Sequence, residues 1–78
     1  MNVAEKVTSI IQEETRIGIN SPTYLLVQDL LLDSLDKTNV ALEIEETYDI
    51  EYISDSVVQN WSSVQDVITT VESILKEK

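Results

Sequence analysis

One serine in this chain stands where its hydroxyl could take part in chemistry. Ser34 lies between two acidic residues, Asp33 and Asp36, where an apolar stretch meets an acidic segment. A nucleophilic serine needs an adjacent base and a third group that orients the base. The chain has no histidine and no cysteine, so a base would have to be Lys37 or a more distant lysine. These residues favour a serine that receives a modification over a serine that catalyses a reaction.

The acidic residues offer little other chemistry. Glu45 and Glu46 are adjacent, and adjacent residues on a helix do not face each other, so they cannot work as an acid–base pair. The pattern of an EF-hand loop is missing, and so is a Gly-rich phosphate loop. We therefore expect no catalytic residue, no metal site and no nucleotide site.

The charge of the chain is strongly negative. Its 78 residues include 15 acidic and 5 basic ones, which gives a net charge of −10. Such a charge repels nucleic acids and anionic membranes and attracts basic protein surfaces. The N-terminal residues lack a basic segment followed by an apolar one, so we expect no signal peptide, and no stretch is long enough to span a membrane. We expect a single soluble domain over residues 1–78, cytoplasmic and monomeric, with no nucleic-acid partner and no membrane insertion.

Hydrophobic periodicity predicts two helices separated by a long connection. Residues 2–16 carry apolar side chains at helical spacing, with Asn2 as the N-cap and Gly18 as the C-terminal stop. Residues 17–33 form the connection, which is apolar enough to lie across a helical core. The second helix is expected over residues 34–49.

The second helix should present two different faces. If Asp33 is its N-cap, Ser34 takes the first helical position with its hydroxyl free. Four residues form the expected core face: Val40, Ala41, Ile44 and Tyr48. Leu35 and Leu42 lie on another face among carboxylates, which indicates a docking surface. The alternative is that these two leucines cover neighbouring loop residues.

Two more helices are expected after the second one. A short helix near residues 55–60 would begin at Ser54 or Asp55, and a last helix would span residues 62–76. Two pairs could form the capping box of the last helix: Ser62 with Gln65, or Ser63 with Asp66. The expected fold is therefore an all-α four-helix bundle with three long helices, one short helix and a long loop between the first two.

The order of these features resembles the acyl carrier protein family over nearly the whole chain. The segment Asp33-Ser34-Leu35-Asp36 opens an acidic helix in a small four-helix chain, and Asp29-Leu30 precedes it. The resemblance implies that Ser34 carries 4′-phosphopantetheine, attached by a phosphopantetheinyl transferase, and that the thiol of this group holds acyl groups as thioesters. The chain would then be a carrier that other enzymes use, and not an enzyme itself.

The resemblance also implies two groups of residues around the serine. Basic patches on acyltransferases and synthases would dock on Asp33, Leu35, Asp36, Leu42, Glu45 and Glu46. The acyl chain would lie in a pocket near Val27, Leu30, Ile44, Ile53 and Trp61.

Four departures from the family pattern bear on the pathway. Leu31-Leu32 stand where a small pair such as Gly-Ala is usual, and Trp61 stands where a branched aliphatic residue is usual. Lys37 and Asn39 stand where residues are often neutral or acidic, and the loop near residues 50–60 is one residue longer. They favour a carrier dedicated to one pathway within fatty-acid, polyketide or related lipid biosynthesis. Two alternatives are a peptidyl or aminoacyl carrier, and an unmodified acidic helical adaptor that binds basic partners.

Overall fold

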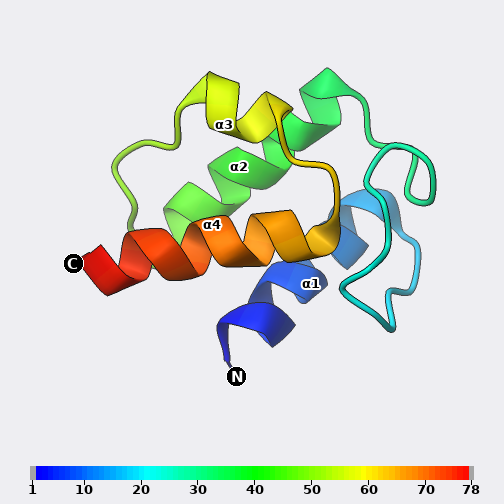
Figure 1. The fold of residues 1–78 in the computed structure, drawn as a ribbon, viewed down its shortest axis with the longest axis horizontal. Helices are drawn as coiled ribbons and strands as arrows, with labels where there is room; N and C mark the ends of the chain where they lie inside the picture. Colours follow the sequence, from blue (N-terminus) through cyan, green and yellow to red (C-terminus); the bar gives the residue numbers. More distant parts are fainter. Residues whose placement is uncertain (1, 78) are drawn as a thin grey trace.

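The computed structural model describes residues 2–77, and four helices make up its architecture (Figure 1). These are α1 (Val3–Thr15), α2 (Ser34–Tyr48), α3 (Asp55–Gln59) and α4 (Val64–Glu77). Helix α1 packs against both α2 and α4, and the short α3 packs against α2. The expected all-α fold with three long helices and one short helix is confirmed. None of the helices within residues 2–77 has the length and apolar character needed to cross a membrane.

Helix α1 begins as expected but ends earlier. The Asn2 side chain caps it by accepting the Glu5 amide at 2.8 Å. The expected stop at Gly18 is wrong, because Arg16 takes the left-handed conformation at the C-terminus with φ 62°. The chain leaves the helix two residues before the glycine, and the Gln12 side chain accepts the amide of Ile19 at 2.7 Å. Ending there allows Ile19 to join the core.

Helix α2 is capped at its start by two aspartates. Asp33 is the N-cap, and Asp36 completes a capping box with it. The helix ends at Asp49, which takes the left-handed conformation. Its expected core face is confirmed, because Val40, Ala41 and Ile44 are buried. Tyr48, the fourth residue of this face, is half-buried.

The last two helices are capped by serines. Ser54 accepts the Val57 amide at 3.3 Å and begins α3. At the start of α4, the Ser63 hydroxyl accepts the Asp66 amide at 3.3 Å, and the Asp66 carboxylate accepts the Ser63 amide at 3.1 Å. Of the two expected capping boxes, the second is therefore the one that forms, and α4 begins two residues later than expected.

The long connection between α1 and α2 is ordered by its own hydrogen bonds and by buried leucines. The Leu25 carbonyl accepts the Asp29 amide at 2.9 Å and the Leu30 amide at 3.2 Å, so this part turns once without forming a helix. Leu25 also forms an isolated antiparallel bridge with Ser63. Three leucines of the connection are buried: Leu26, Leu30 and Leu32. The connection therefore lies across the helical core, as its composition predicts.

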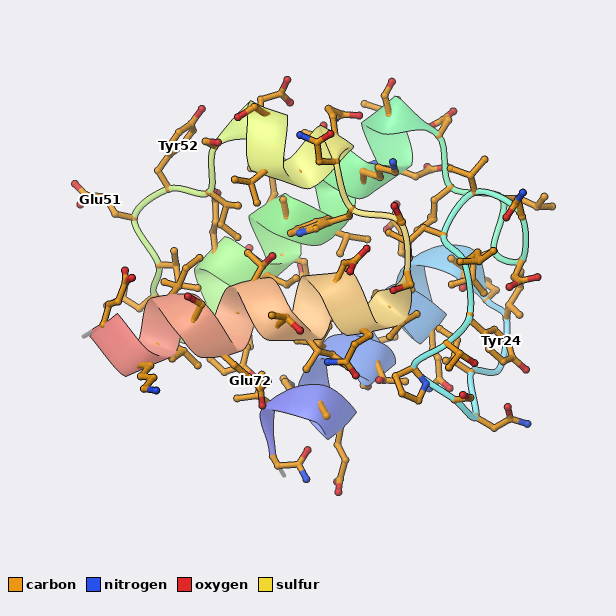
Figure 2. All side chains as sticks on the ribbon, viewed as in Figure 1. Tyr24, Glu51, Tyr52 and Glu72 are labelled. Atoms are coloured by element: carbon orange, nitrogen blue, oxygen red, sulfur yellow. The ribbon has the colours of Figure 1, made fainter. Side chains whose placement is uncertain are left out.

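The connection between α2 and α3 lies more openly. Figure 2 shows Glu51 and Tyr52 projecting from it away from the body of the molecule, and the Tyr52 side chain is 70% exposed. Ile50 and Ile53, one on each side of this pair, are buried. The two isoleucines therefore fix the ends of this connection and leave its middle exposed.

Candidate functional site

Ser34 is the first residue of α2 and is exposed to solvent. Within residues 2–77 its hydroxyl makes no hydrogen bond. Its carbonyl accepts the Thr38 hydroxyl at 3.0 Å and the Gln59 side-chain amide at 3.3 Å. The backbone of Ser34 is thus held in place from two directions, whereas its hydroxyl is free to react with an external group.

The two aspartates around Ser34 explain why its hydroxyl is free. Asp33 accepts the Asp36 amide at 2.9 Å, and Asp36 accepts the Asp33 amide at 3.3 Å. In many helices a serine performs this capping, and its hydroxyl is then used up. The first turn of α2 also carries the positive end of the helix dipole, which favours an anionic group attached there.

Lys37 lies on the core face of α2, where a charged residue is not expected. It is only 8% exposed, and its Nζ donates to the Gln59 carbonyl at 3.3 Å. The available signal was its position on the helix, because it precedes the buried Val40 and Ala41 by three and four residues and so shares their face. Its apolar stem can be buried there with its charged end directed to one carbonyl.

Exposed apolar side chains occur in the segments that precede and follow the serine. Leu31 is 75% exposed, Leu35 is 66% exposed and Val27 is 55% exposed. Leu31 also has a φ of 58°, in the left-handed region that favours glycine. A glycine, which the resemblance to acyl carrier proteins leads us to expect at position 31, would adopt this conformation without strain.

The six predicted docking residues differ in solvent exposure and in their hydrogen bonds to the backbone. Leu35 and Leu42 are exposed on α2, and Glu46 is exposed too. Glu45 is half-buried, and its carboxylate accepts the Ile53 amide at 2.6 Å. With Asp33 and Asp36 paired in the capping box, three of the four carboxylates in this group also stabilise local backbone.

The five predicted pocket residues are placed in several parts of the molecule. Four of them are buried: Leu30, Ile44, Ile53 and Trp61. Val27 is exposed and lines, together with Trp61, a hollow of about 340 Å³ between the long connection, α2 and the segment before α4. Ile53 lines two other hollows, one of which also includes Leu42. The Trp61 indole donates to the Thr70 hydroxyl at 2.9 Å, which fixes the ring against α4.

The carboxylates are spread widely enough that, among residues 2–77, no three of them come together as a group that could hold a metal ion. The chemistry of this region therefore depends on the free hydroxyl of Ser34, its capped helix terminus, and the apolar and acidic residues around it.

Comparisons with known proteins agree with this geometry. No family model matches the chain. An acyl carrier protein of Solidesulfovibrio magneticus is 40% identical over 76 residues, which cover 92% of this chain and 94% of that protein. An acyl carrier protein of Onion yellows phytoplasma is 37% identical over 70 residues, which cover 85% and 88% of the two chains.

A solved structure gives the same result for the fold. A chain from Mycobacterium tuberculosis, described as an acyl carrier protein, superposes with a TM-score of 0.83 at 33% identity, over 92% of this chain and 97% of that one. The fold and the serine at the start of α2 define a small helical carrier domain. The chain belongs to the acyl carrier protein family.

Proposed function

We propose that this protein carries acyl groups as thioesters on a 4′-phosphopantetheine attached to Ser34. One observation supports the attachment site above the others: Ser34 lies exposed at the start of α2, and its hydroxyl makes no hydrogen bond within residues 2–77. Asp33 at the N-cap and Asp36 provide the capping of α2, and Ser34 at the first helical position takes no part in it. The hydroxyl is therefore available to a modifying enzyme without loss of the helix cap.

The residues around Ser34 fit the group that the family implies. The oxygen of Ser34 would form a bond to phosphorus and displace adenosine 3′,5′-bisphosphate from coenzyme A, with the base and Mg²⁺ supplied by the transferase. The resulting phosphodiester anion lies at the positive end of the α2 dipole. When bound, the group supplies the thiol that holds an acyl group. The protein has no cysteine and so has no thiol of its own.

The outer face of α2 is the proposed surface for the enzymes that load and use the carrier. The exposed Leu35 and Leu42 would contact apolar residues of a partner, and carboxylates around them would pair with its basic residues. The net charge of −10 would speed the encounter with a basic surface at low ionic strength. We propose a phosphopantetheinyl transferase, acyltransferases and synthases as partners, in the cytoplasm, with the carrier itself performing no catalysis.

The pathway is proposed only as a class, namely fatty-acid, polyketide or related lipid biosynthesis. The exposed, left-handed Leu31 and the buried Trp61 support a carrier dedicated to one such pathway.

The attachment is tested by intact mass. The purified apo protein is incubated with coenzyme A, Mg²⁺ and a promiscuous phosphopantetheinyl transferase, and we expect its mass to rise by one phosphopantetheine. Ser34→Ala should not react, whereas Ser62→Ala, which removes another exposed serine just before a helix, should react like the wild type. An unchanged wild-type mass, or a mass gain that persists in Ser34→Ala, would refute the proposal.

The same variants separate the alternatives. If the protein is an unmodified adaptor, the Ser34→Ala variant should bind its partners as well as the wild type does. An aminoacyl carrier would be loaded by an adenylating enzyme with an amino acid in preference to an acyl donor.

A further inference from the structure

The hollow that Val27 and Trp61 line differs in charge from the rest of the surface. It contains Lys37, and none of the eight residues that line it is acidic. Neighbouring hollows carry carboxylates, such as Asp66 in one and Glu45 in another. Two carboxylates adjoin the hollow, Asp29 and Asp66, and they accept the backbone amides of the lining residues Leu25 and Ser62. Lys37 is therefore the charged side chain of the lining that an anionic ligand in the hollow can contact.

The surroundings of Lys37 leave its charge only partly compensated. Lys37 is mostly withdrawn from water, and an ammonium with little water around it is costly unless its three hydrogens find acceptors. Within residues 2–77, the Gln59 carbonyl at 3.3 Å is the one hydrogen-bond acceptor of Lys37 Nζ. A carboxylate that entered the hollow could accept from the ammonium and would form a stronger, charge-assisted bond.

The hollow lies beside the attachment site. Gln59 accepts from Lys37 with its carbonyl and donates to the Ser34 carbonyl with its side chain, at 3.3 Å in both cases. Lys37 is also one helical turn after Ser34 on α2. A flexible arm on the serine can therefore fold back so that its acyl end reaches this hollow.

The walls of the hollow indicate a polar cargo more than a plain aliphatic chain. Val27 and Trp61 offer apolar contact for a few methylene groups. Gln28, Gln59 and Asn60 add amide groups. The side-chain NH₂ groups of Gln59 and Asn60 already donate to the Ser34 and Ser56 carbonyls, whereas the Gln28 side chain makes no hydrogen bond within residues 2–77 and would lose its water under a plain alkyl chain.

We infer that Lys37 selects acyl groups that end in a carboxylate, that is, half-thioesters of dicarboxylic acids. The carboxylate binds Lys37 Nζ, and the methylene groups lie against Val27 and Trp61. The phosphodiester is the weaker candidate for Lys37, because it is fixed to the exposed oxygen of Ser34 whereas the ammonium is directed toward the Gln59 carbonyl at the end of α3, beside the hollow. This inference rests on the proposed attachment at Ser34.

The test compares two acyl groups with the same number of carbon atoms. Glutaryl and pentanoyl groups are loaded from their coenzyme A thioesters by the promiscuous transferase, and intact mass confirms that loading is complete. The rate of thioester cleavage by hydroxylamine is then measured for each, relative to the same thioester of free pantetheine. We expect the carrier to slow cleavage of the glutaryl group roughly tenfold more than cleavage of the pentanoyl group, because hydrogen bonds to charged groups are strong enough for such a factor.

Variants assign this effect to one side chain. Lys37→Met should make the two relative rates equal, and Lys37→Arg should retain most of the difference. Lys76→Met removes the same charge from an exposed position near the end of α4 and should behave like the wild type. Thermal denaturation checks that each variant is folded, and Lys37→Gln replaces Lys37→Met if the latter is not.

Two results would overturn the inference. Equal protection of both acyl groups in the wild type would show that the hollow does not distinguish a carboxylate. If Lys37→Met instead changes cleavage of both acyl groups by the same factor, Lys37 serves the phosphodiester or the arm. A failure of the proposed function is seen earlier, since no acyl mass would be added to the wild type at all.

Discussion

Asp33 and Asp36 cap each other's backbone across the first turn of α2, with distances of 2.9 Å and 3.3 Å between the amide nitrogens and the carboxylate oxygens. Ser34 lies between them and takes no part in this exchange. The same four-residue segment thus separates two roles, because the aspartates hold the helix terminus while the serine hydroxyl stays accessible. This separation predicts that stability and modification can be changed independently.

Replacing the cap should destabilise the protein, and replacing the serine should not. Asp33→Ala removes the acceptor for the Asp36 amide, so we expect the free energy of unfolding to fall by about 1 kcal/mol. Asp33→Asn keeps an acceptor oxygen and should lose less. Ser34→Ala should change it by less than about 0.5 kcal/mol, since its hydroxyl has no partner to lose. Urea denaturation measures all three, and a Ser34→Ala loss as large as that of Asp33→Ala would contradict this division of roles.

Glycine at position 31 should make the protein more stable. Leu31 has a φ of 58° and is 75% exposed, so the side chain adds backbone strain and buries little surface. The left-handed conformation costs a leucine about 1–2 kcal/mol. A glycine avoids this strain, but its greater conformational freedom in the unfolded chain offsets part of the gain. We therefore expect Leu31→Gly to raise the free energy of unfolding by roughly 0.5–1 kcal/mol in urea denaturation.

The neighbouring leucine provides the control for that substitution. Leu32 is 3% exposed, and truncating a buried leucine leaves a cavity. Leu32→Ala should therefore destabilise the protein by about 2–4 kcal/mol. If Leu31→Gly also destabilises, Leu31 makes contacts in solution that outweigh its strained backbone.

Much of the fold could be predicted because the signals are local. The caps at Asn2 and Asp33, and the apolar stripe around Val40, depend on residues within one or two turns of each other. Arg16 is different: it takes the left-handed conformation although a glycine follows at position 18, and Ile19 beyond it is buried. The identity of the residues near a helix end does not by itself say at which of them the chain leaves the helix to enter the core.

The candidate site divides in the same way. Ser34 could be predicted from its own segment, since the residues that free its hydroxyl are its neighbours. For Lys37 the sequence indicates only its place on the core face of α2, because the carbonyl that its ammonium contacts belongs to Gln59 in α3, 22 residues away. The half-buried state of Glu45 likewise depends on the amide of Ile53 in the next connection. Lysine and glutamate are usually solvated, so only the folded chain reveals these two contacts.

Two adjacent glutamates at the end of α2 should separate stability from docking. Glu45 accepts the Ile53 amide at 2.6 Å, whereas Glu46 is exposed. Glu45→Ala leaves that amide without its acceptor and should lower the free energy of unfolding by about 1 kcal/mol. Glu46→Ala should change it by less than about 0.5 kcal/mol. Urea denaturation of the two variants gives the comparison.

The kinetics of the transferase then report on docking. If the outer face of α2 meets a basic surface, Glu46→Ala should lower kcat/KM by a few-fold at low ionic strength, and added salt should reduce the difference. Glu72→Ala removes one exposed carboxylate from α4 instead and serves as the matched control. Equal effects of these two variants would mean that net charge matters and that the face of α2 does not.

Tyr48 gives the protein a predictable response to alkaline pH. Burial raises the pKa of the Tyr48 phenol above its ordinary value of 10.0, because the phenolate is poorly solvated against the core. The folded state therefore holds this proton more tightly than the unfolded state. Its contribution to stability is complete below pH 10 and is lost as the pH rises through the higher pKa of the folded protein.

The Tyr48→Phe variant isolates this group, because phenylalanine cannot ionise. The phenolate absorbance of the wild type and of the variant is followed against pH, and the difference between the two curves gives the titration of Tyr48. We expect its midpoint to lie above 10.0, and a midpoint at or below that value would show that the ring is solvated in the folded protein.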